Sequence, residues 1–214
     1  MAAQHILQFL MEANKLKDVQ RRGITFYGVK KADSALDHSF RMALMVLLFG
    51  KEKNINMAKA MKMSLIHDIC KVITGDITPY DGIAAKNKKE KAELVSRWRR
   101  LPLEEKSKMQ REKTAKEKEA FKKLTKDLPL NIKTEMSQLW LDYSQAKSKE
   151  ARFVQQINVV ENLLEAFEGW LANKKFPTMP WWEHVNEVVD DPILLDFIKE
   201  ISKAELKEIC KKEK

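Results

Sequence analysis

Glycine and proline are scarce in this chain, with only six of each among 214 residues. These two residues supply the tight turns that β-sandwiches and barrels need in large number. Lysine, glutamate, alanine, leucine and methionine are common instead, and all five favour helices. We find no convincing strand pattern and no internal repeat, so the sequence predicts an all-α fold.

Apolar residues recur at helical spacing over most of the chain. Helices are predicted at about 3–16, 34–50, 56–68, 85–99, 103–125, 131–145, 149–171, 181–190 and 192–202, with loops at 18–33 and 75–82. Ser34 and Asn56 are suitable N-caps, and Gly50 is a suitable C-cap. The helix at 34–50 is apolar on nearly all sides, so we expect it to be central.

The positive charge of the chain is concentrated in one segment. Residues 86–126 contain 16 basic and 7 acidic side chains, which equals the net charge of +9 for the whole chain. Acidic residues are interleaved with the lysines, as on an exposed helix: Glu104, Glu105, Glu112, Glu117 and Glu119. Trp98 and Phe121 are the only aromatic residues there, so no stacking pattern for nucleic acid accompanies the charge. We interpret the segment as a solvated helical excursion and do not expect a nucleic-acid partner.

We find no segment in the sequence that predicts a membrane span or a secretory signal. The longest uncharged apolar stretch, Met42 to Gly50, is far shorter than the roughly 20 residues that a membrane-spanning helix needs. The two cysteines, Cys70 and Cys210, are far apart in the sequence. We therefore expect a reducing, cytoplasmic location and no membrane partner.

Two of the four histidines are candidates for chemistry. His38 lies early in the most apolar predicted helix, and His67 is followed directly by Asp68 near the end of the next one. A single helical histidine is usually structural, but two histidines and an aspartate on neighbouring apolar helices can converge on one buried site. Imidazole nitrogen and carboxylate oxygen are the ligands of open transition-metal sites. The remaining histidines are interpreted as a surface helix residue, His5, and as an interface or packing residue, His184.

Three motifs resemble those of a known family. The segments Asp37-His38-Ser39-Phe40-Arg41, Leu65-Ile66-His67-Asp68 and Gly75-Asp76-Ile77-Thr78-Pro79 resemble the motif series of HD-domain metal-dependent phosphohydrolases. The resemblance is closest to the 5′-deoxynucleotidase branch, which hydrolyses nucleoside 5′-monophosphates. Further segments that fit this branch are Arg21-Arg22-Gly23, Gly28-Val29-Lys30 and Ala151 to Asn158. The resemblance spans about residues 5–170. It implies a helical HD domain at 1–180 with the basic excursion at 86–126, and a helical extension at 181–214 packed on the same domain.

The resemblance also assigns roles to individual residues. It implies that His38, His67 and Asp68 are metal ligands, that Asp76 acts on the attacking water or the leaving group, and that Arg21 contacts the substrate. The family's fourth ligand is an aspartate, and Asn158 stands at that position here. The family has a water-activating glutamate four residues after the second histidine, and that position is Lys71. By helical i,i+4 spacing we expect Lys71 to face the site, where it can bind phosphate.

These two replacements make the site three charge units more positive than the family pattern. Weaker metal binding and slower hydrolysis are therefore expected, whether the ion is Mn, Co, Mg, Zn or Fe. Two other functions remain open from the sequence. One is an impaired homologue that binds nucleotide or phosphate, and the other is a scaffold or assembly subunit that uses residues 86–126. Related proteins commonly form dimers, so a homodimer is also expected.

Overall fold

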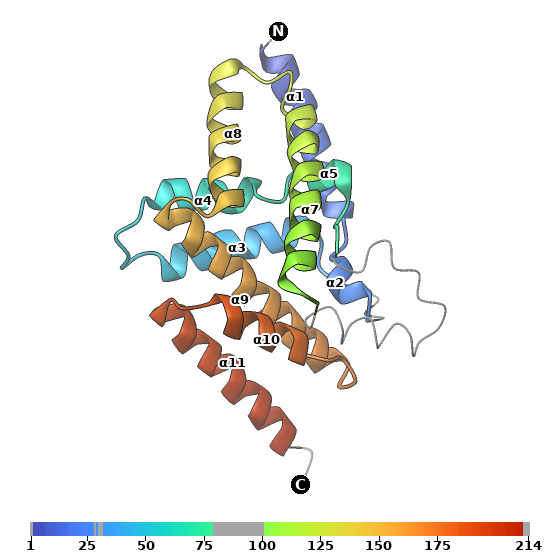
Figure 1. Cartoon of the computed structure of the whole chain (residues 1–214), viewed down its shortest axis with the longest axis vertical. Helices are drawn as coiled ribbons and strands as arrows, with labels where there is room; N and C mark the ends of the chain where they lie inside the picture. The colour runs from blue at the N-terminus through green and yellow to red at the C-terminus, as the bar shows by residue number, and fades with distance from the viewer. Residues whose placement is uncertain (1, 28, 30–31, 79–100, 212–214) are drawn as a thin grey trace.

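The computed structural model describes residues 2–27, 29, 32–78 and 101–211, and this part of the chain is all-α (Figure 1). Its helices are α1 (Ala2–Ala13), the 3₁₀ helix η1 (Asn14–Asp18), α2 (Arg22–Thr25), α3 (Ala35–Phe49), α4 (Met57–Ile66), α5 (Lys71–Thr74), α7 (Leu103–Leu124), α8 (Leu130–Gln145), α9 (Lys149–Ala172), α10 (Met179–Val188) and α11 (Pro192–Cys210). Extended pairing in these residues is limited to one isolated bridge between Gln20 and Ser34. The helix expected at 85–99 falls outside the described residues, as do Gly28, Lys30 and Pro79.

The helix ends follow local capping chemistry. The Ser34 side chain accepts the backbone N–H of Asp37 at 3.2 Å, and the Asp37 carboxylate accepts the N–H of Ser34 at 2.8 Å, which forms a capping box. Asn56 caps α4 through the N–H of Lys59, and Gly50 ends α3. The three capping predictions are therefore confirmed.

Three predicted boundaries are wrong. The short helix α2 lies inside the predicted loop 18–33, and α11 continues to Cys210, well beyond residue 202. Helix α4 stops at Ile66, and residues 67–70 form turns before α5 begins. This last difference matters for the site, because His67 and Asp68 lie in the turn and not on a helix.

The main hydrophobic core surrounds α9, which crosses the middle of the molecule (Figure 1). Helices α3, α4, α8, α10 and α11 all pack against it. The buried side chains of this core include Met42, Val46, Met63, Ile157, Val160, Leu163, Val185, Leu194 and Ile198. Helices α10 and α11 thus share one core with the rest of the chain.

A second, smaller cluster joins the turn at 67–70 with α7 and α8. Its buried members are Ile69, Cys70, Ala120, Phe121 and Trp140. The rings of Phe121 and Trp140 stack with their centroids 5.3 Å apart, and Phe121 is only 2% exposed. This contact attaches the C-terminal half of α7 to the body of the protein.

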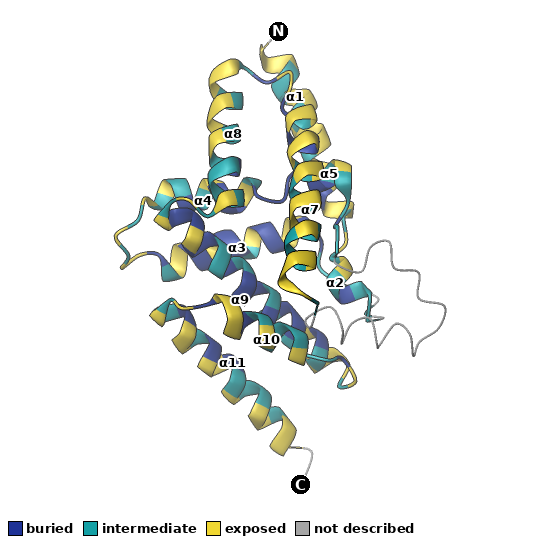
Figure 2. Ribbon diagram, viewed as in Figure 1, coloured by how far each residue is buried: buried dark blue, intermediate teal, exposed yellow. Residues whose placement is uncertain are grey.

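Helix α3 is not buried all round, contrary to our expectation. One face packs on α4 and α9. The α3 ribbon carries exposed as well as buried residues (Figure 2), and the exposed ones include a row of large apolar side chains. The members of this row, with their exposed fractions, are Leu36 at 42%, Phe40 at 62%, Leu44 at 42%, Leu47 at 50% and Leu48 at 70%. We call this row the α3 stripe.

The last features of the fold are the state of the two cysteines and the apolar character of the helices. Cys70 is buried, Cys210 is exposed, and both are free thiols. Among the described helices, none combines the length and the apolar character needed to cross a bilayer.

Candidate active site

His38, His67 and Asp68 come together at the junction of α3 and the turn after α4. One ligand atom from each residue lies within 4.8 Å of the others, and all three residues are buried. Oδ2 of Asp68 is 3.3 Å from Nε2 of His67 and 3.9 Å from Nε2 of His38. The structure therefore brings together the three residues for which the sequence predicted a common metal site.

The hydrogen bonds of the two histidines fix which nitrogen faces this point. Nδ1 of His67 donates to the backbone carbonyl of Ser64 at 2.8 Å. Nδ1 of His38 is hydrogen-bonded to the carboxylate of Glu161. Because both acceptors need a proton on Nδ1, each neutral ring carries its lone pair on Nε2.

Both Nε2 atoms are buried and have no hydrogen-bond partner. Burial and the nearby charge of Arg21 lower the pKa of His38 to about 4, which keeps the ring neutral. A carboxylate or carbonyl behind each ligating histidine is the usual second layer of a metal site. The donor set therefore fits a divalent ion.

Glu161 supports His38 from behind the site, and the sequence pattern assigned no role to this glutamate. It is fully buried on α9, and its other oxygen accepts from Nε of Arg41 at 2.8 Å. Burial alone would raise its pKa, but His38, Arg21 and Arg41 together lower the pKa of Glu161 to about 2. Its position three residues after Asn158 placed it on the correct helix face, but nothing in the sequence indicated a partner for it.

Lys71 points into the site and not toward solvent. Its Nζ lies 2.7 Å from Oδ2 of Asp68 and 2.7 Å from Oδ1 of Asp76, and the residue is 4% exposed. Lys71 thus lies where we expected it, but not because of helical spacing. No continuous helix joins His67 to Lys71, since the turn at 67–70 separates α4 from α5.

Asp76 reaches the site because the chain reverses at Gly75. Gly75 has φ 68° and ψ −177°, a conformation open in practice only to glycine. Both oxygens of Asp76 are engaged, Oδ1 by Lys71 and Oδ2 by the backbone N–H of Arg22 at 2.8 Å. Burial would raise the pKa of Asp76, but Lys71 and Arg21 outweigh it and lower the pKa.

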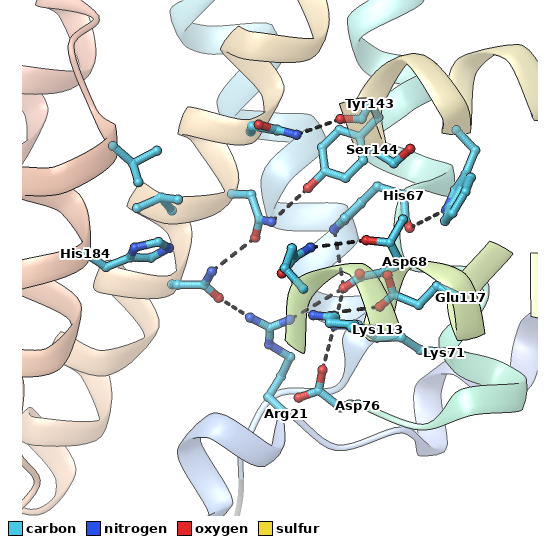
Figure 3. A pocket seen from close by; sticks show the side chains of 18 residues that line it. Arg21, His67, Asp68, Lys71, Asp76, Lys113, Glu117, Tyr143, Ser144 and His184 are labelled. Atoms are coloured by element: carbon cyan, nitrogen blue, oxygen red, sulfur yellow. Dashed lines mark hydrogen bonds and ion pairs between the residues drawn. The ribbon is translucent and has the colours of Figure 1, made fainter. Parts of the chain in front are cut away.

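Arg21 lies across the site from Lys71 (Figure 3). Its guanidinium group is 3.5 Å from Oδ2 of Asp68 and 3.4 Å from Oε2 of Glu165, and it donates to the side-chain oxygen of Asn162. Glu165 is buried, and this burial raises its pKa to about 8 in spite of the Arg21 charge. The predicted substrate-contacting arginine is thus held rigidly at the pocket wall.

Asn158 lines the same pocket but lies outside the three-residue group. Its side-chain amide donates to the Tyr143 hydroxyl at 2.8 Å and accepts from Asn162 at 3.1 Å. The Tyr143 ring in turn contacts the His67 ring, with centroids 5.2 Å apart. A direct role of Asn158 as a ligand stays a prediction.

These residues line a pocket of about 410 Å³, a size typical of small-ligand sites. Two of its lining residues were misplaced from the sequence. His184, interpreted as an interface or packing residue, lies on the α10 side of the pocket, and Glu117, interpreted as part of an exposed helix, has a side chain only 14% exposed on the α7 side. Figure 3 shows Glu117 and Lys113 of α7 together with Asp68 and Lys71 at one end of the pocket, and His184 at the other.

Comparisons with known proteins find relatives over most of the chain. The HD domain family matches residues 13–178. The chain is 31% identical over 200 residues to the 5′-deoxynucleotidase HDDC2 of Bos taurus, covering 93% of this chain and 85% of that protein. It is 33% identical over 166 residues to the protein of the same name from Homo sapiens, covering 78% and 69%. The crystal structure of PH0347 from Pyrococcus horikoshii has a similar fold, with a TM-score of 0.66, 22% identity and coverage of 92% and 98%.

Proposed function

The chain belongs to the HD domain family, and from this premise we propose that it is a metal-dependent phosphohydrolase of nucleoside 5′-monophosphates. One observation carries the proposal. The two unpartnered Nε2 atoms of His38 and His67 converge with Asp68 at the base of a pocket whose walls carry Arg21 and Lys71. The relatives named above are 5′-deoxynucleotidases, which supports the same substrate class.

His38, His67 and Asp68 would hold the divalent ion. When bound, such an ion polarises a phosphoryl oxygen and makes an attached water more acidic. The cationic groups of Arg21 and Lys71 face the same space, where they bind the phosphate dianion and orient its phosphorus toward the water. Asp76, kept ionised by Lys71 and Arg21, orients that water and accepts its proton.

A phosphate-release assay tests the function. We expect phosphate from nucleoside 5′-monophosphates in the presence of one of Mn²⁺, Co²⁺, Mg²⁺, Zn²⁺ or Fe²⁺, and little or none with chelator. Comparing deoxyribose with ribose substrates then defines the sugar preference. The Asp76→Ala variant, which lacks the proposed proton acceptor, serves as the control with reduced activity. Nucleotide-induced thermal stabilisation without phosphate release would contradict hydrolysis and favour an impaired, nucleotide-binding homologue.

We also propose that Asn158 contributes the fourth ligand position of the ion, directly or through water. Its support is that Asn158 lines the same pocket as His67 and Asp68, while its amide lacks the negative charge of an aspartate. Asn158→Asp should tighten metal binding by about tenfold or more, because affinity rises with the number of charged ligands. Isothermal titration calorimetry with Mn²⁺ measures this change in affinity.

The control for this variant is Asn173→Asp at the exposed C-terminal end of the same helix. It adds the same charge far from the pocket and should leave the affinity unchanged. Equal affinities for wild type and Asn158→Asp would remove Asn158 from the ligand set.

The α3 stripe supports a homodimer. A contiguous exposed apolar row of this kind usually marks an interface, and a single helix face can pair with its own copy around a twofold axis. We expect twice the chain mass by light scattering for the wild type. The double variant Phe40→Glu, Leu48→Glu should be monomeric, while Leu10→Glu, on the exposed face of α1, should not change the mass. A monomeric wild type would overturn the dimer.

We also propose a cytoplasmic location. Both cysteines are free thiols, which suits a reducing compartment. Cell fractionation would check it. The division into an HD domain at 1–180 and an extension at 181–214 also stays a prediction.

A further inference from the structure

Helix α7 forms one wall of the pocket, although its sequence resembles that of a fully solvated helix. Phe121 fixes its rotation by stacking on Trp140. Residues one to three turns earlier on the same side of the helix are then directed at the pocket: Gln110, Lys113, Thr114 and Glu117. The inward side of α7 is therefore apolar near its C-terminal end and polar where it meets the pocket.

Glu117 is one of three carboxylates among the described residues that line this pocket, with Asp68 and Asp76. Asp68 belongs to the proposed metal group, and Asp76 is assigned above to the attacking water. The ion pair of Glu117 with Lys113 spans 3.7 Å, which is longer than a hydrogen bond. Of the three, Glu117 is thus the carboxyl group best able to engage a substrate atom.

We propose that Glu117 is a catalytic residue that protonates the departing 5′-oxygen of the nucleotide. The inference rests on the proposed hydrolysis of nucleoside monophosphates. The departing oxygen is an alkoxide, which is a poor leaving group unless a proton reaches it as the bond to phosphorus breaks. Position 71, where the family resemblance places a carboxylate, holds an ammonium here and leaves proton transfer to other groups.

The step balances as follows. The oxygen of water forms a new bond to phosphorus, and its proton goes to Asp76. The bond between phosphorus and the 5′-oxygen breaks, and its electron pair stays on that oxygen. The carboxyl proton of Glu117 joins this oxygen, which gives the nucleoside hydroxyl and inorganic phosphate. Glu117 then regains a proton from solvent, and Asp76 returns its proton to solvent.

The electrostatic surroundings of the two carboxyl groups suit this division of roles. Charged and titratable groups face Glu117 from three elements: Lys113 of α7, Tyr143 of α8, and His67, Asp68, Cys70 and Lys71 around the α4–α5 turn. Burial, and then repulsion from Asp68, raise the pKa of Glu117 in spite of Lys113. The pKa of Asp76 moves in the opposite direction. Two carboxyl groups with oppositely displaced pKa values are the usual arrangement of an acid and a base.

Glu117→Gln tests the proposal, since glutamine keeps the size and has no proton to transfer. Turnover of a nucleoside 5′-monophosphate should fall by about 100-fold or more, with little change in KM. The loss should be much smaller for p-nitrophenyl phosphate, because its leaving phenolate is stable without a proton. The basic limb of the kcat–pH profile, where wild-type activity falls as the acid ionises, should disappear. Metal content and nucleotide-induced thermal stabilisation should remain.

Two variants of the same helix serve as controls. Glu119→Gln changes a side chain that is 72% exposed and pairs with Lys122, and it should behave as wild type. Glu117→Asp keeps the acid and should recover part of the turnover together with the basic limb.

A failure of the role of Glu117 can be told apart from a failure of the proposed function. An active wild type whose turnover and basic limb survive Glu117→Gln would overturn the role of Glu117 alone. An equal loss on both substrates with an unchanged pH profile would also overturn it and would make Glu117 structural. A wild type that releases no phosphate from any nucleotide would overturn the proposed function and this inference together.

Discussion

Replacing His67 by alanine is expected to remove both the bound metal and the hydrolysis. The ring is 4% exposed, its Nδ1 is fixed by the Ser64 carbonyl, and its Nε2 faces Oδ2 of Asp68 at 3.3 Å. Changes in the residues behind a metal ligand typically cost about 10–100-fold in affinity, so loss of the ligand itself should cost more. Metal analysis after gel filtration and phosphate release from a nucleoside monophosphate measure the two effects.

His5→Ala on α1 is the matched control, because it removes an imidazole outside the pocket lining. It should retain wild-type metal content and turnover. The far-ultraviolet circular dichroism of both variants establishes that the fold is kept. Full metal content in a folded His67→Ala variant would contradict the proposed site.

The second large expected effect is an increase in turnover. Lys71→Glu should raise turnover at saturating metal by about 100-fold, the lower end of what a general base contributes. The ammonium group lies 2.7 Å from both Asp68 and Asp76, so it competes with a divalent ion for Asp68 and supplies no base. A glutamate there removes the competing cation and adds a proton acceptor beside the water. Steady-state kinetics across a metal titration gives both kcat and the metal requirement.

Lys71→Met separates the two causes of this increase. Methionine removes the charge without adding a base, so it should tighten metal binding but leave kcat low. Without metal, Lys71→Glu brings three carboxylates together and should lower the melting temperature, and added metal should restore it. Equal kcat for wild type and Lys71→Glu would show that the position takes no part in water activation.

The fold was predictable where local chemistry decides it. Ser34, Asn56 and Gly50 mark helix ends through contacts with residues three or four positions away, and such contacts are visible in a sequence. The metal group was predictable because histidine is scarce and two histidines stand on adjacent apolar segments.

Other features depend on tertiary packing, and no local sequence pattern predicts them. Glu117 lies in a segment of alternating charges, where every side of the helix looks alike until the stacking of Phe121 on Trp140 sets its rotation. The α3 stripe was hidden for a related reason. An apolar helix surface indicates that something covers it, but not whether the cover comes from the same chain. Glu161 stands three residues after Asn158 on α9, yet its partner His38 is 123 positions away.

The placement of the pocket between two hydrophobic clusters has a consequence for its fluctuations. His38 and Asn158 stand on helices of the main core, whereas Glu117 and Trp140 belong to elements of the smaller cluster. The Trp140 indole also donates to the backbone carbonyl of His67 at 3.2 Å, so the small cluster holds the turn that carries Asp68. Local opening of this cluster would dismantle the pocket while the main core stays folded. A bound ligand would therefore slow amide hydrogen exchange most strongly in α7 and α8, and its residence time would follow the opening rate of that cluster.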